Sequence, residues 1–231
     1  MDIRLAIISY VILLLSMTCH EASHALAALK LGDPTAYYHG QVTLDPVPHI
    51  RREPFGMVII PILSFVLWGW MIGWASAPYD PYWAQHNRKK AALMALAGPT
   101  TNLLLVIIAA IAIRGGMLFG VFYAPQTVTF EHVTEAEAPG FANAIAVVIS
   151  ILFSLNLVLL VFNLIPLPPL DGSNVLSLFL SDQAAERYAQ MMRQPGARII
   201  GLVIAWQLIG VVLSPIQTFA LNLLYPGAGY H

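Results

Sequence analysis

The sequence predicts an all-α polytopic membrane protein with about four to six transmembrane or re-entrant helices and a small membrane-associated β-hairpin. Hydrophobic residues make up 58% of the 231 residues and charged residues only 10%. A soluble domain carries about a quarter of its residues as charges. Several apolar runs also reach about 20 residues, the length of a helix that spans a hydrocarbon core. We therefore expect one integral membrane domain over residues 1–231, with the lipid bilayer and not nucleic acid as its surroundings.

The first predicted span, residues 1–30, is apolar until a polar motif near its inner end. His20 and His24 lie four residues apart, so both face the same side of a helix and can bind one metal ion, with Glu21 beside it. This H-E-x-x-H pattern is typical of zinc hydrolases. A charged side chain inside a span costs about 2.5 to 3.5 kcal/mol, which a metal would offset and simple packing would not.

The region after this span is predicted to stay at the membrane surface. Residues 35–52 are expected to form the β-hairpin, with Gly40 at its turn and a strand from Gln41 to Leu44. Residues 55–77 are apolar and long enough to span. Proline and glycine interrupt them, however, and three tryptophans crowd their second half, so a re-entrant segment is favoured.

Three further apolar segments complete the predicted fold. Residues 91–113 form a span that carries AGPTTN, and residues 197–224 form the C-terminal apolar segment. Residues 141–172 form a span that ends in NLIPLPPLDG, where prolines must unwind the helix. Unwound backbone at membrane depth lines a polar cavity or is buried in protein. Asp171 is then either a carboxylate aimed into a polar pocket or a simple turn residue, and the pattern alone leaves both open.

The distribution of Lys and Arg favours the re-entrant interpretation of residues 55–77. Since positive residues concentrate on cytoplasmic loops, a good topology separates them strongly. If all segments cross, 7 Lys and Arg residues lie on the cytoplasmic side and 4 lie outside. If residues 55–77 do not cross and the N-terminus lies outside, 9 lie on the cytoplasmic side and 2 lie outside. The second arrangement also puts the histidine pair nearer the cytoplasmic face.

The three motifs HEASH, AGPTTN and NLIPLPPLDG, in this order, resemble the signature set of site-2 proteases, the intramembrane zinc metalloproteases. GQVTLDP is similar to the compact prokaryotic branch that lacks PDZ and CBS domains, although SAP at 76–78 departs from that branch's Lys-Pro-Val. The resemblance implies one Zn²⁺ per chain, held by His20, His24 and Asp171 with water in the fourth position. It also implies Glu21 as the general base and Asn102 as a hydrogen-bond donor to the oxyanion.

By the same resemblance, the chain is a zinc metalloendopeptidase that cleaves a peptide bond within or next to a transmembrane segment of its protein substrates. Asn163 resembles a position that holds the substrate strand. Val42 and Thr43, on the expected strand, could pair with the unwound substrate. A bacterial or archaeal plasma membrane is implied. The sequence predicts neither a particular substrate nor an oligomeric partner.

Two alternatives remain open from the sequence. A non-enzymatic zinc-binding membrane protein, such as a metal transporter or a chaperone-like binder, could use the same histidines. The zinc site could also be completed by Glu53 or Asp45 in place of Asp171.

Overall fold

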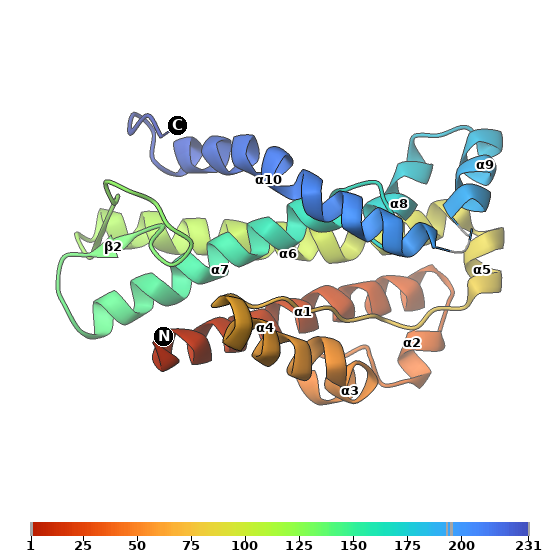
Figure 1. The fold of residues 1–231 in the computed structure, drawn as a ribbon, viewed down its shortest axis with the longest axis horizontal. Helices are drawn as coiled ribbons and strands as arrows, with labels where there is room; N and C mark the ends of the chain where they lie inside the picture. The colour runs from red at the N-terminus through yellow and green to blue at the C-terminus, as the bar shows by residue number, and fades with distance from the viewer. Residues whose placement is uncertain (1, 193, 195, 231) are drawn as a thin grey trace.

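Four long apolar helices run side by side through the molecule in alternating directions (Figure 1). The computed structural model describes residues 2–192, 194 and 196–230. Within these residues, the four helices are long and apolar enough to cross a membrane. They are α1 (Ile3–Leu31), α6 (Arg88–Leu118), α7 (Phe141–Leu164) and α10 (Ala197–Leu224). The structure thus confirms the predicted all-α membrane fold class.

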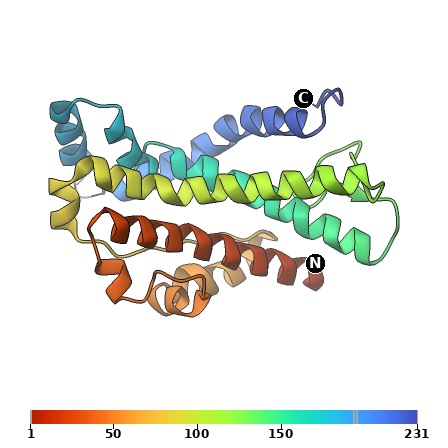
Figure 2. The same ribbon diagram turned by 180° about the vertical axis from the view of Figure 1, so that it is seen from behind.

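Helix α6 is the centre of the bundle, because it packs along both α1 and α7 (Figure 2). Its interior face carries the fully buried Asn102, which bonds to His20 of α1 on one side and to Asn156 of α7 on the other. Towards its C-terminal end, α6 joins α7 and α10 in a hydrophobic cluster that includes Ile113 and Phe153. The bundle therefore has a polar section near its middle and an apolar section at one end.

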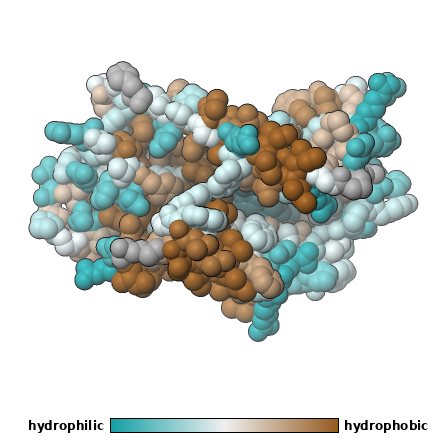
Figure 3. Space-filling model, viewed as in Figure 1, coloured by the Kyte–Doolittle hydropathy of each residue, from teal (hydrophilic) through white to brown (hydrophobic). Residues whose placement is uncertain are grey.

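Helix α10 is the least buried of the four and packs mainly on α7. Exposed apolar side chains cover its outer face and that of α4 (Ile60–Trp68), and Figure 3 shows these two faces as separate hydrophobic areas. Apolar surface of this extent is expected of a protein whose outer solvent is lipid.

The chain between α1 and α6 makes an excursion along the bundle and returns to the end where it started (Figure 1). A π-helical turn (Phe55–Ile59) leads into α4, and residues 69–80 then run back without helix to α5 (Pro81–His86). Residues 55–68 form a helical segment only about 21 Å long at 1.5 Å per residue, less than a hydrocarbon core of about 30 Å. The chain therefore enters and leaves this stretch at the same end of the bundle.

The predicted hairpin at residues 35–52 is wrong. This region forms the short helices α2 (Thr35–Tyr38) and α3 (Pro46–Arg52), and residues 41–44 contain no strand. The Asp45 carboxylate accepts a hydrogen bond from the Val47 amide, so the Asp-Pro pair at 45–46 is an N-cap followed by proline in the first helical turn. This helix-start signal outweighs the β-propensity of the preceding residues.

The two strands of the described chain lie elsewhere. β1 (Phe122–Tyr123) and β2 (Glu135–Ala136) pair antiparallel in the loop between α6 and α7, at the opposite end of the bundle from α5. After α7 the chain forms α8 (Gly172–Val175), a 3-10 turn (Leu176–Leu178) and α9 (Asp182–Met192). An ion pair between Arg88 and Glu186 ties α9 to the start of α6.

Candidate metal centre

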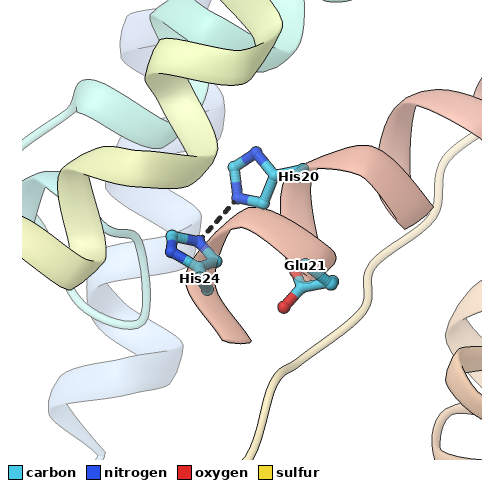
Figure 4. Close-up of side chains that lie close together, drawn as sticks. All are labelled: His20, Glu21 and His24. Atoms are coloured by element: carbon cyan, nitrogen blue, oxygen red, sulfur yellow. Dashed lines mark hydrogen bonds between the residues drawn. The ribbon is translucent and has the colours of Figure 1, made fainter. Parts of the chain in front are cut away.

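Two imidazole rings from successive turns of α1 meet at their Nε2 atoms (Figure 4). His20 and His24 project from one face of the helix because they are four residues apart. Their Nε2 atoms are 3.0 Å apart. Both side chains are buried where α1 packs against α6, so packing restricts the positions of the rings.

The second nitrogen of each ring determines where its hydrogen lies. His24 Nδ1 is 2.8 Å from the carbonyl oxygen of Met94, and a carbonyl can only accept, so Nδ1 donates. His20 Nδ1 is 2.6 Å from Oδ1 of Asn102, which also accepts. In a neutral ring whose Nδ1 carries the hydrogen, Nε2 presents a lone pair. Both histidines therefore direct ligand lone pairs at the same point.

Asp171 brings a carboxylate to this point from the turn after α7. Its Oδ2 lies 3.0 Å from His20 Nε2 and 3.2 Å from His24 Nε2. The turn is fixed by close packing, since a Cβ on Gly172 would lie 2.3 Å from the carbonyl oxygen of Leu164. Asp171 thus belongs to the polar pocket, although it is about 150 residues away in sequence.

Glu21 lies beside the histidines (Figure 4) and lines the same cavity as residues 75–79. The side chain is buried, and its Oε2 has no hydrogen-bond partner among the described residues. An unpaired buried polar atom costs about 1 to 3 kcal/mol, and more when charged. Such a group is expected where a ligand or a metal-bound water supplies the missing partner.

Gly98 of α6 faces the two histidine rings at close range. A Cβ at this position would lie 2.4 Å from Nε2 of both His20 and His24. The glycine of AGPTTN therefore keeps the facing helix clear of the two ligand atoms. The sequence motif marked this position, but only the packing shows its purpose.

The carboxylate and the two rings line a cavity of about 190 Å³. Its opposite wall is the extended segment 75–79, and Asn163 and Asn174 contribute further polar side chains. Asn163 also donates from Nδ2 to the carbonyl oxygen of Leu159, so its amide oxygen is free to face the cavity. The site is therefore a small, partly enclosed pocket.

Several residues named from the sequence lie outside this lining. Val42 and Thr43 do not line the cavity, and the strand that was to carry them is absent. Asn102 is fully buried behind His20, with its oxygen on the ring and its Nδ2 donating to Asn156. Asn102 therefore does not line the cavity, where contact with an oxyanion was expected.

The two other carboxylates that were considered as ligands have different partners. Asp45 caps α3, and Glu53 accepts a hydrogen bond from Ser76. Of these three carboxylates, Asp171 is the one that contacts both histidine rings.

The donor set fits zinc. Two imidazole nitrogens and one carboxylate oxygen are typical of a catalytic zinc site that keeps one open position. Ligand atoms at about 2.0 to 2.1 Å from a tetrahedral ion lie about 3.3 Å from one another. The separations of 3.0 to 3.2 Å among the three atoms of this cluster are close to that value.

Comparison with known proteins agrees with this geometry. A model of peptidase family M50 matches residues 8–208. The chain is 36% identical over 165 residues to YwhC of Bacillus subtilis, and 31% identical over 179 residues to Rip2 of Mycobacterium tuberculosis, both named as candidate zinc metalloproteases. The matches cover 71% and 76% of this chain but only 65% and 58% of those relatives. No solved structure matched the chain.

Proposed function

Because the chain belongs to peptidase family M50, we propose that it is a zinc metalloendopeptidase that cleaves membrane-protein substrates within or next to a transmembrane segment. One observation carries the proposal. His20, His24 and Asp171 converge on one point, and the unpartnered carboxylate of Glu21 lies beside them in the same small cavity.

In this proposal His20, His24 and Asp171 hold one zinc ion, and each ligand has its own support. The Met94 carbonyl orients His24, the Asn102 amide orients His20, and the turn after α7 delivers Asp171. When bound, zinc lowers the pKa of a water ligand to about 7 and polarises a carbonyl oxygen.

Glu21 acts as the general base. Its buried carboxylate has no hydrogen-bond donor among the described residues. A water in the cavity would supply this donor, and the same water must lose a proton before it can attack a peptide carbonyl. The same carboxyl group then returns the proton to the leaving amine. Glu21 is buried beside the histidines and lines the same cavity.

The cavity constrains the form of the substrate. A helix is about 10 Å wide with its side chains and hides its carbonyls in its own hydrogen bonds. A cavity of about 190 Å³ is smaller than a single helical turn about 10 Å wide and 5.4 Å long, so a helix does not fit. The substrate must therefore unwind locally, and the amide of Asn163 is placed to hold the extended backbone.

We further propose that residues 55–80 enter the membrane and leave it on the same side, with the N-terminus of α1 outside and the metal centre nearer the cytoplasm. Cysteines introduced at the exposed positions Arg51 and Lys89, in a variant whose native Cys19 is replaced by alanine, should react with a membrane-impermeant reagent from the same side. Labelling from opposite sides would contradict this topology.

Zinc analysis beside a cleavage assay tests the function. Purified wild-type protein in lipid vesicles should contain one zinc per chain and cleave some members of a panel of single-span substrates. Glu21→Gln should keep the zinc and lose cleavage by roughly 10²- to 10⁴-fold, because only proton transfer is removed. Asp171→Asn should lose zinc as well. If Glu21→Gln kept both its zinc and the wild-type level of cleavage, Glu21 would not be the general base. A wild-type protein that binds zinc but cleaves no substrate would favour a structural or transport role.

A further inference from the structure

The hydrogen-bond chain behind His20 ends on Asn156, a residue of α7 that lies outside the cavity. Nδ2 of Asn102 donates to Oδ1 of Asn156 at 2.9 Å. Nδ2 of Asn156 in turn lies 2.8 Å from the carbonyl oxygen of Leu152 and 2.9 Å from Oγ of Ser16. Ser16, Asn102 and Asn156 are all fully buried, so water does not offer alternative partners.

This series of hydrogen bonds has a fixed donor-to-acceptor direction, because the Leu152 carbonyl at one end can only accept a hydrogen bond. The Leu152 carbonyl has no hydrogen to give, so the NH₂ group of Asn156 must face it. The oxygen of Asn156 then faces Asn102, whose NH₂ group donates to it. The oxygen of Asn102 is left to face His20, and Nδ1 of His20 must therefore carry a hydrogen.

We propose that Asn156 is a positioning residue of the metal centre, which sets the amide of Asn102 and through it leaves the Nε2 lone pair of His20 free for the metal. This inference rests on the proposed function, since it assigns that lone pair to zinc. His24 needs no such device, because its Nδ1 bonds directly to the Met94 carbonyl.

Without Asn156 the amide of Asn102 has no partner that selects one of its two orientations. In the reversed orientation its NH₂ group faces His20 and favours a ring with the hydrogen on Nε2. That hydrogen occupies the position where the metal binds, so metal binding has to displace it. Loss of a hydrogen bond that orients a metal-binding histidine typically lowers metal affinity about 10- to 100-fold.

The test is zinc affinity, measured on the full-length protein in lipid nanodiscs by competition with a chelator after the metal has been removed. Asn156→Leu should weaken zinc binding about 10- to 100-fold. Asn156→Asp should restore most of the affinity, because full burial among the uncharged partners Asn102, Ser16 and the Leu152 carbonyl favours the neutral acid. Its OH group can then donate to the Leu152 carbonyl while its C=O accepts from Asn102.

Two controls separate orientation from general damage. Ser16→Ala removes one acceptor of Asn156 but leaves the Leu152 carbonyl, so the direction persists and zinc affinity should not change. Ser150→Ala removes a buried hydroxyl of the same helix that accepts from the Val133 and Thr134 amides. It should lower the unfolding temperature without changing zinc affinity.

Equal zinc affinity in Asn156→Leu and wild type, or an equal loss in Ser150→Ala, would overturn the inference while the proposed function stands. Asn156→Ser, which is small and can bond back to the Leu152 carbonyl but cannot reach Asn102, replaces the leucine variant if that variant does not fold. Its affinity should fall in the same way. A wild-type protein that binds no zinc would instead overturn the proposed function, and this inference with it.

Discussion

Gly98→Ala is expected to weaken zinc binding while leaving the bundle folded. Gly98 is a helical residue of α6 with no positive φ, so alanine is not strained there. In a helix interior alanine is better than glycine by about 0.5 to 1 kcal/mol. The new methyl group would nevertheless lie 2.4 Å from Nε2 of His20 and of His24.

The size of the effect follows from these distances. Ordinary contacts of a Cβ begin at 3.4 Å, so the methyl group must be separated from each ring by a further 1.0 Å (3.4 − 2.4). A zinc site tolerates ligand displacements of about 0.2 Å. The required movement is thus about five times the tolerance and acts on two ligands at once. We expect zinc affinity to fall at least as far as for a lost orienting hydrogen bond, by about 100-fold or more.

Two measurements on the purified protein are needed, the zinc dissociation constant and the unfolding temperature of the metal-free form. Gly115→Ala is the matched control, since Gly115 lies on the same helix and a Cβ there would meet nothing within 4 Å. We expect Gly98→Ala to lose affinity with an unchanged or raised metal-free unfolding temperature, and Gly115→Ala to keep its affinity. Wild-type zinc affinity in Gly98→Ala would refute the placement of the metal between α1 and α6.

Two further predictions concern the segments that frame the site. Gly172→Ala should lower both stability and zinc affinity, because its Cβ would meet the rigid backbone carbonyl of Leu164 at 2.3 Å; the metal-free unfolding temperature separates it from Gly98→Ala. Burial raises the pKa of Asp33, but hydrogen bonds from Thr35 and from the Asp80 amide outweigh burial and hold that pKa below its usual value. Its contribution to stability is therefore present above the unfolded-state pKa of about 3.9 and is lost as the pH falls through the lower folded-state pKa. Asp33→Asn should cost about 1 to 3 kcal/mol at pH 7, and thermal unfolding should show a smaller difference from wild type near pH 3.

The parts of the fold that follow from local composition could be predicted from the sequence. Long apolar runs specify spanning helices, because a bilayer leaves the backbone few other ways to satisfy its hydrogen bonds. The two histidines were also accessible, since four-residue spacing on a helix is a local property. Asp171 needed more. The prolines before it showed that the helix must end, but only the family resemblance linked it to His20 and His24.

The errors arose where two local signals competed or where the outcome depended on distant contacts. Residues 41–44 have β-propensity, but the Asp-Pro pair that follows starts a helix, and propensity is the weaker signal. Asn102 was expected to face the substrate, and its motif does not reveal on which side of His20 it lies. That depends on how α6 packs against α1 and α7, a tertiary property.

Helix α6 supplies no ligand in this arrangement, yet it governs the site through three of its residues. Gly98 leaves room for the metal, while the carbonyl of Met94 and the amide of Asn102 orient the two rings. All three act on side chains of α1, so a small shift of α6 along α1 changes the space and both hydrogen bonds together. In the proposed zinc site, we therefore expect zinc affinity to depend on the packing of these two helices. In the proposed metal site, the motif AGPTTN therefore positions the histidine ligands of the neighbouring helix α1 and supplies no ligand itself.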